Sequence, residues 1–329
     1  MEKDPQYYVK GVLSQNKRIL AKTITLIESS RTDHQELSRQ ILTELLPYTG
    51  RSVRLGITGI PGAGKSTLIE SLGMFLIEQG HRTAVLAVDP SSARSGGSVL
   101  ADKTRMERLS AEENAFIRPS PSGGTLGGVA RKTREAMLVC EAAGFDVMII
   151  ETVGVGQSET TVASMVDFFL VILIPGGGDE LQGIKKGILE MADALVINKA
   201  DGDNAARAAT ARQQYETALH LIAPASAVWS PPVLMASAIE MTGVDTIWRT
   251  VQDHRERLVK TGDFELHRKK QAVSWMWALI EEGLKERFRM NQKIRERLPG
   301  LTHDVEKGSI PPTSAADELL FYLDNIETI

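Results

Sequence analysis

The sequence predicts an α/β fold, in which helices cover both faces of a doubly wound, mainly parallel sheet. Between residues 51 and 245, short and nearly continuous apolar runs alternate with longer segments of helical spacing. This alternation is typical of strands that are buried on both faces. The chain before and after this region contains only helical patterns. We therefore expect a helical N-terminal extension over 1–50, the sheet domain over 51–245 and a helical C-terminal arm over 246–329.

The composition is that of a soluble globular protein. Of 329 residues, 42% are hydrophobic and 24% are charged, which allows a large core. The net charge of −4 gives no reason to expect nucleic acid as a partner. The longest apolar run, 168–175, is too short to span a bilayer, and the N-terminus lacks the apolar stretch of a signal peptide. We expect a cytoplasmic protein without a membrane partner, with its single cysteine, Cys140, buried and inert.

The N-terminal extension has apolar residues at spacings of three and four, as in an amphipathic helix. This pattern stops at a breaker cluster, Pro47-Tyr48-Thr49-Gly50. The sheet domain then supplies six expected strands: Leu55–Gly59, Thr83–Val88, Val147–Ile150, Phe169–Ile174, Leu195–Ile197 and Val233–Ala236. Right-handed crossovers would bring the carboxyl ends of these strands to one edge, where ligands collect. Most of the polar motifs directly follow an expected strand.

The first motif is a phosphate-binding loop that follows the first strand and opens a helix. Its residues, Gly59-Ile60-Pro61-Gly62-Ala63-Gly64-Lys65-Ser66, match G-x-x-x-x-G-K-[ST] in full, and Thr67 continues into the helix. Glycines let the main-chain N–H groups face phosphate oxygens, and the helix N-terminus favours negative charge. Lys65 is expected to reach the terminal phosphates, and the Ser66 hydroxyl to ligate Mg²⁺.

A second motif selects the base. Asn198-Lys199-Ala200-Asp201 follows the strand Leu195–Ile197. A carboxylate at Asp201 would accept hydrogen bonds from the ring N–H and the exocyclic amine of guanine, whereas adenine would leave it unpaired. Ser237 and Ala238, at the end of the next strand, fit a loop whose main-chain N–H groups back the base. The sequence therefore predicts binding of GTP and GDP.

A third motif, Glu151-Thr152-Val153-Gly154, follows the strand Val147–Ile150. Many GTPases carry an acid here that holds the magnesium shell and a glycine that senses the γ-phosphate. No glutamine directly follows Gly154, since Gln157 comes three residues later. A residue that orients the attacking water is therefore not evident, and we expect slow intrinsic hydrolysis that a partner accelerates.

Three loops supply further candidates. Asp89 and Asp102 lie after the second strand as possible magnesium-shell carboxylates, although either could be a solvated loop acid or a helix cap. A glycine-rich stretch over 120–128, before a helix expected from Val129, is a second anion cradle or, more simply, a connection between switch segments. The segment 175–185 combines three glycines with polar side chains and places Lys185 near the γ-phosphate.

The C-terminal arm carries a helical stripe through a charged segment, from Val273 to Phe288. It either packs on the nucleotide domain or serves as a surface for self-association, and its length favours the second. A loop over 302–314 should precede a terminal helix, Ala315–Asn325.

With these pieces in order, the chain resembles the MeaB/ArgK family of P-loop GTPases, which includes relatives of the methylmalonic aciduria type A protein. The match is densest in the phosphate loop, in the guanine motif and in four other runs: 88–92, 102–106, 123–130 and 151–159. The last run, Glu151-Thr152-Val153-Gly154-Val155-Gly156-Gln157-Ser158-Glu159, is specific to the family and accounts for the glutamate at 151.

The resemblance implies a homodimeric GTPase, held partly by its C-terminal arm, which carries Mg²⁺ and GTP. Its implied partner is an adenosylcobalamin-dependent methylmalonyl-CoA mutase, for which it acts as a chaperone that gates cofactor loading and protects against inactivation. Cobalamin would belong to the partner. The expected catalytic residues are Lys65, Asp89, Glu151 and Lys185, and the expected metal ligands are Ser66, Asp89, Asp102 and Glu151.

Three other functions agree less well with the sequence. An ATPase or kinase of a lysine/arginine/ornithine transport system is disfavoured by Asp201, which reads guanine. A nickel-delivery GTPase is disfavoured because the six histidines are scattered and there is one cysteine. A targeting GTPase of the signal-recognition type is disfavoured because the methionines are dispersed rather than gathered in one helical domain.

Overall fold

The computed structural model of the protein describes residues 4–88, 106–119, 126–152, 158–176, 186–222 and 228–324. The chain divides into two compact units, Met1–Lys269 and Lys270–Ile329. The first unit holds the sheet and the N-terminal helices, and the second holds most of the C-terminal arm. The boundaries near 50 and 245 that the sequence suggested remain predictions.

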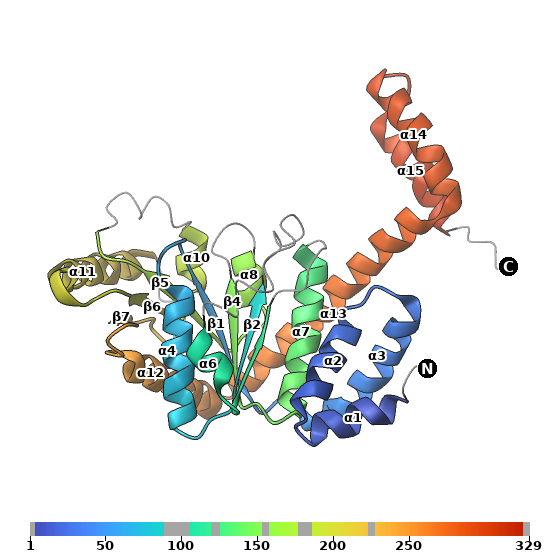
Figure 1. The fold of residues 1–329 in the computed structure, drawn as a ribbon. Coiled ribbons are helices and arrows are strands. Elements are labelled where there is room, and N and C mark those ends of the chain that lie inside the picture. Colours follow the sequence, from blue (N-terminus) through green and yellow to red (C-terminus); the bar gives the residue numbers. More distant parts are fainter. Residues whose placement is uncertain are drawn as a thin grey trace. The chain divides into compact units, whose positions relative to one another are not determined.

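The first unit is built on a parallel sheet, which confirms the predicted fold class (Figure 1). The strand order is β3-β2-β4-β1-β5-β6-β7, and every pair of neighbours runs parallel. Six strands match the expected ones, and the edge strand β3 was not expected. The strands are β1 (Val53–Gly59), β2 (Thr83–Val88), β3 (Ala115–Arg118), β4 (Val147–Thr152), β5 (Phe168–Leu173), β6 (Ala194–Ile197) and β7 (Val233–Met235).

Strand β5 shows why these strands are apolar along their whole length. Phe169, Val171 and Leu173 point into the core on one face of the sheet. The alternate residues, beginning at Phe168, point into the core on the other face. Because successive side chains of a strand point to opposite faces, a strand covered on both sides needs no polar positions.

Helices cover both faces of this sheet (Figure 1). The helices of one face pack on the core that contains Phe169; they are α1 (Pro5–Leu13), α2 (Lys17–Ile27), α3 (Thr32–Leu45), α7 (Leu126–Ala142), α8 (Ser158–Ala163), α10 (Lys186–Met191) and α11 (Ala205–Ile222). The helices of the other face are α4 (Lys65–Glu78), α6 (Glu107–Ala111) and α12 (Val244–Thr261). Cys140 of α7 is fully buried, as expected, and burial raises the pKa of its thiol.

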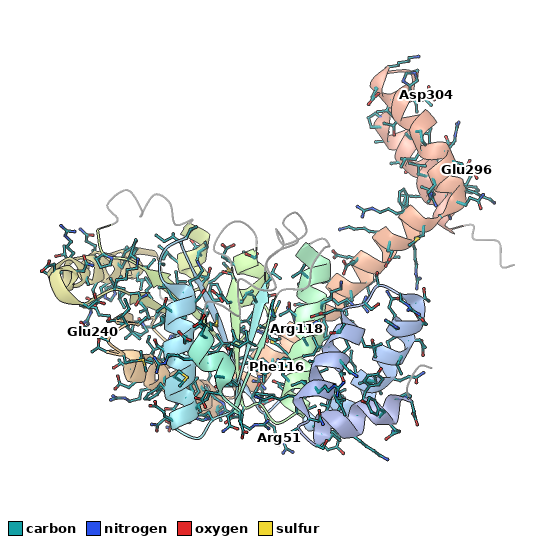
Figure 2. All side chains as sticks on the ribbon, viewed as in Figure 1. Arg51, Phe116, Arg118, Glu240, Glu296 and Asp304 are labelled. Atoms are coloured by element: carbon teal, nitrogen blue, oxygen red, sulfur yellow. The ribbon has the colours of Figure 1, made fainter. Side chains whose placement is uncertain are left out.

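The N-terminal extension is helical, as predicted, and ends in the 3-10 turn η1 (Leu46–Tyr48). The Asn16 side chain caps α2 by accepting hydrogen bonds from the main-chain N–H groups of Arg18 and Ile19, each at 3.1 Å. Arg118 at the end of β3, labelled in Figure 2, forms an ion pair with Glu28, which directly follows α2. The extension is therefore packed against the sheet rather than detached from it.

Buried charges link the sheet to the first turns of α13 (Asp263–Met290). Arg54 of β1 pairs with Glu141 of α7, with Nε 2.9 Å from Oε1. Burial acts to raise the pKa of Glu141, but the Arg54 guanidinium and hydrogen bonds lower it below its usual range. Arg268 of α13 places its Nη2 2.6 Å from Oδ2 of Asp167, which precedes β5. These ion pairs lie at the edge of the sheet where the strands begin. The sequence motifs lie at the opposite edge, where the strands end.

The second unit has a small core of its own. It contains the rest of α13, α14 (Gln292–Glu306) and α15 (Pro312–Asp324), and the buried apolar residues of its core are Ile294, Leu301, Ala315 and Leu319. The sequence predicted a loop over 302–314. These bounds are wrong, because α14 continues to Glu306 and α15 begins at Pro312. Leu301 and Val305 continue the apolar stripe of α14 and pack against α15. Pro312 begins α15, and proline suits the first position of a helix.

Among the helices of the described residues, none combines the length and apolar character that crossing a membrane requires.

Candidate nucleotide-binding site

The phosphate loop connects the end of β1 to the start of α4, in the strand–loop–helix context that its motif requires. Gly64 has a φ of 86°, and a Cβ atom there would lie 2.7 Å from the side-chain amide of Asn198. At Gly59, where φ is 156°, a Cβ atom would lie 2.4 Å from the carbonyl oxygen of Ile172. Both positions therefore require glycine, which lets the loop run close to its neighbouring strands.

Lys65 lies in the first turn of α4 and folds back over the loop. Its Nζ donates hydrogen bonds to the carbonyl oxygens of Gly59, at 2.8 Å, and Ile60, at 3.2 Å. Phosphate oxygens would offer this ammonium stronger, charge-assisted partners. The N-terminus of α4, a helix of 14 residues, adds its partial positive charge at the same place.

Ser66 and Glu151 bring two oxygen ligands together. The Ser66 hydroxyl donates to Oε1 of Glu151 at 2.9 Å. Glu151 is the fifth residue of β4, and the hydroxyl of the next residue, Thr152, donates to the Thr58 hydroxyl of β1 at 2.7 Å. A carboxylate and a hydroxyl oxygen are ligands that Mg²⁺ accepts, so this pair fits a magnesium site beside the phosphate loop.

Asn198 connects the guanine motif to the phosphate loop. The residue directly follows β6, and its side chain is 1% exposed. Its Nδ2 donates to the carbonyl oxygen of Ala63 at 2.8 Å, and its Oδ1 accepts a hydrogen bond from the main-chain N–H of Ala238 at 3.3 Å. One side chain thus joins the phosphate loop, the turn after β6 and the loop after β7.

Asp201 lies in the same turn, beside Ser237. The Ser237 hydroxyl donates to Oδ2 of Asp201, and it also accepts a hydrogen bond at 3.2 Å from the main-chain N–H of Glu240, which is labelled in Figure 2. Lys199 has a φ of 59°, a left-handed conformation that turns the chain sharply between Asn198 and Asp201. The structure therefore brings together the guanine motif and the weakly signalled pair Ser237 and Ala238.

The other predicted site residues divide into two groups. Pro61 and Gly62 are exposed at the tip of the phosphate loop, and Thr67 is exposed in the first turn of α4. Asp89, Asp102 and Lys185 lie outside the described residues, as do positions 120–125 of the glycine-rich stretch. Helix α7 begins at Leu126, three residues before the expected Val129. The roles assigned to all these residues stay predictions.

Three residues near the site were not singled out from the sequence. Glu70 and Ser71 lie in the second turn of α4, and their side chains contact α6 and the loop after β7, both distant in the chain. Ile239 is 81% exposed directly after Ala238, an unusual place for an aliphatic side chain. The exposure of Ile239 has no clear local signal, because the residues around it, Ala236-Ser237-Ala238 and Met241, are largely apolar themselves. The other two depend on contacts that no local pattern reveals.

The phosphate loop, the Ser66–Glu151 pair and the Asn198–Asp201 turn all lie at the carboxyl edge of a doubly wound parallel sheet. Together they define a P-loop nucleotide-binding protein of the GTPase class. Residues 20–293 match the family model described as methylmalonyl Co-A mutase-associated GTPase MeaB. The chain belongs to this MeaB family of GTPases.

Similar proteins agree with this assignment. A putative GTPase of Caulobacter vibrioides is 58% identical over 305 residues, which cover 93% of both chains. The mitochondrial methylmalonic aciduria type A homolog of Mus musculus is 47% identical, over 94% of this chain and 77% of the mouse protein. A crystal structure described as LAO/AO transport system kinase superposes with a TM-score of 0.79 at 39% identity and covers 99% of this chain.

Proposed function

We propose that this protein is a GTP-hydrolysing chaperone that assists and protects an adenosylcobalamin-dependent methylmalonyl-CoA mutase and gates the loading of its cofactor. GTP as the hydrolysed nucleotide is supported by the hydrogen bonds of the Asn198 side chain, which hold the proposed guanine-binding turn against the phosphate loop. The mutase as partner is supported by the description of the family model and by the relation to the mouse protein. A cytoplasmic site of action is part of the proposal.

In this proposal each described residue has a distinct task. Lys65 leaves the carbonyl oxygens of Gly59 and Ile60 to hold the β- and γ-phosphates. Ser66 and Glu151 would hold Mg²⁺, together with Asp89 and Asp102, and Lys185 would approach the γ-phosphate. The bound Mg²⁺ would neutralise negative charge on the phosphate oxygens. Asp201 and the loop at Ser237 and Ala238 hold the base.

Slow hydrolysis of GTP is typical of a molecular switch rather than of an enzyme with rapid turnover. The chain has no glutamine directly after Gly154, and the first glutamine follows at Gln157. We therefore expect a low single-turnover rate that rises when the mutase binds. A fast rate without any partner, measured on enzyme with one bound GTP, would contradict this part of the proposal.

Binding to the mutase can be tested directly. The purified protein is mixed with the methylmalonyl-CoA mutase of the same organism under GTP, GDP and no nucleotide, and the mixtures are separated by size-exclusion chromatography. We expect co-elution that depends on the nucleotide, together with a higher GTPase turnover. Asp201→Ala serves as the matched variant, because it should lose the nucleotide dependence. If no complex forms in any state, the chaperone role is wrong, whereas GTP hydrolysis is unaffected.

The second candidate is an ATPase or kinase associated with an amino-acid transport system, and the description of the similar crystal structure favours it. The two candidates differ in nucleotide. Affinities for GDP and ADP, measured by calorimetry for wild type and Asp201→Ala, should show a guanine preference that disappears in the variant. A preference for ADP in the wild type would favour the transport role.

A further inference from the structure

Helix α4 touches the guanine loop as well as the phosphate site. The Ser71 hydroxyl, in the second turn of this helix, donates a hydrogen bond of 2.7 Å to the carbonyl oxygen of Ala238. Ser71 is 4% exposed and Ala238 is 6% exposed, so water does not compete for this contact. The two residues are 167 positions apart in the chain. The contact therefore joins the helix of the phosphate loop to the loop after β7.

This hydrogen bond completes a closed chain of contacts around the base-binding turn. Ala238 is held at both main-chain groups, since its carbonyl accepts from Ser71 and its N–H donates to Asn198 at 3.3 Å. Asn198 in turn donates to Ala63 of the phosphate loop, which leads back into α4. The N–H belongs to the peptide unit before Ala238 and the carbonyl to the unit after it, so one hydrogen bond holds each of the two planar peptide units that flank this residue.

We propose that Ser71 is a positioning residue for guanine selection, which acts through the main chain at Ala238. The inference rests on the proposed guanine-binding role of this loop. Ser71 does not touch the base itself. It orients the Ala238 peptide and, next to it, the Ser237 hydroxyl that contacts Asp201. Without the Ser71 hydroxyl, the Ala238 carbonyl would be buried and unpaired, and the loop would shift to reach another donor.

Nucleotide discrimination in Ser71→Ala tests the proposal. Dissociation constants for GDP and ADP are measured by calorimetry, and kcat and KM for GTP are measured at saturating Mg²⁺. We expect GDP affinity to fall on the order of tenfold, as for the loss of one buried hydrogen bond, while ADP affinity stays the same. KM for GTP should rise by a similar factor with kcat unchanged, since Lys65 and Ser66 are untouched. Ser71→Thr, which keeps the hydroxyl, should restore the GDP/ADP ratio.

A matched control separates positioning from simple loss of stability. Ser52→Ala removes another buried hydroxyl, one that donates to Glu141 at the opposite edge of the sheet. It should lower the unfolding free energy without changing the GDP/ADP ratio. If Ser71→Ala does not fold, Ser71→Cys offers a weaker donor of similar size and should give a smaller loss in the same direction.

Two outcomes would overturn the proposal. In the first, Ser71→Ala keeps the wild-type GDP/ADP ratio. In the second, GDP and ADP affinities fall by the same factor, which means that the whole site is disturbed. A wild-type protein that prefers neither nucleotide would instead overturn the guanine assignment itself, and this inference with it.

Discussion

The side chains of Asn198 and Asp201 leave the same short turn after β6 but have different partners. Asn198 is 1% exposed, and its side-chain amide forms hydrogen bonds with Ala63 on one side and Ala238 on the other. Asp201 is partly exposed, and its carboxylate accepts a hydrogen bond from the Ser237 hydroxyl. The first residue therefore builds the site, and the second remains available to read the base.

Replacing Asp201 with asparagine should change the preferred base. Xanthine has a carbonyl oxygen where guanine has its exocyclic amine, so an amide N–H at position 201 can donate to it. In Asp201→Asn we expect GDP affinity to fall about 100-fold or more and XDP affinity to rise, because each base pairs with only one of the two side chains. Calorimetric titrations with GDP and XDP measure both changes. Competition by pyrophosphate, which lacks a base, should be equal in the two proteins, and GDP affinity that survives the change would refute the assigned role.

At the scale of elements, helix α4 is the part on which the motifs converge. Its first turn reaches β4 through Ser66 and Glu151, and its second turn reaches the guanine loop through Ser71. Glu70 accepts a hydrogen bond from the main-chain N–H of Arg108 at 2.8 Å and so caps α6, the helix that follows the segment containing Asp89 and Asp102. Helix α4 thus begins at the phosphate loop and contacts β4, α6 and the loop after β7.

The sequence predicted the elements whose signal is local. The phosphate loop and the guanine motif each lie within one short run, and six strands have long apolar cores. Strand β3 was missed because its apolar run, Ala115-Phe116-Ile117, is short and lies between the polar residues Asn114 and Arg118. The contact between Ser71 and Ala238 could not be predicted, since it depends on how the loop after β7 packs against α4. Long-range pairing of this kind is a property of the fold rather than of a motif.

The contact between β6 and α12 should make stability depend on pH. Burial raises the pKa of Asp193 to about 7, from 3.8, and burial lowers the pKa of His254 to about 4. His254 Nε2 lies 3.6 Å from Oδ1 of Asp193, whose Oδ2 accepts from the Phe169 N–H at 2.7 Å. A raised carboxyl pKa stabilises the fold fully below about pH 4, and this contribution is lost as the pH rises to 7. The lowered histidine pKa gives the opposite slope, with stability lost as the pH falls from 6.5 toward 4.

Asp193→Asn isolates the carboxyl contribution, because an amide oxygen can still accept from Phe169. Relative to wild type, we expect the variant to gain unfolding free energy at pH 8, up to about 2 kcal/mol, since the Asp193 side chain is 31% exposed. The gain should shrink below pH 7 and vanish near pH 4. Urea unfolding at several pH values measures it. Glu256→Gln, at an exposed position of α12, is the control and should keep the wild-type slope. A difference between Asp193→Asn and wild type that is constant with pH would contradict this account.

At the scale of the whole molecule, the second unit is too small to be held by its core alone. The core contains Ile294, Leu301, Ala315 and Leu319, and a large share of the apolar side chains of this unit stays outside it. The exposed apolar side chains of α13 include Val273 (54%), Met276 (49%), Trp277 (57%), Ile280 (42%) and Leu284 (49%). Their spacing of three and four residues places them on one face of the helix. A continuous apolar face of this kind is typical of a protein interface.

We expect this face of α13 to hold two copies of the chain together, as the resemblance to the family implies. Trp277→Glu combined with Ile280→Glu would place two charges in the buried centre of such an interface and should convert a dimer to a monomer. Light scattering coupled to size-exclusion chromatography measures the mass. Ala278→Glu is the matched control, because position 278 is exposed and lies about 100° around the helix from Trp277. The control should remain dimeric, and both proteins should bind GDP as the wild type does, since the nucleotide site lies within the first unit. A double variant that keeps the mass of a dimer would show that the apolar face binds a different partner. The mutase is then the first candidate. Repeating the co-elution experiment with this variant would test whether the face binds the mutase.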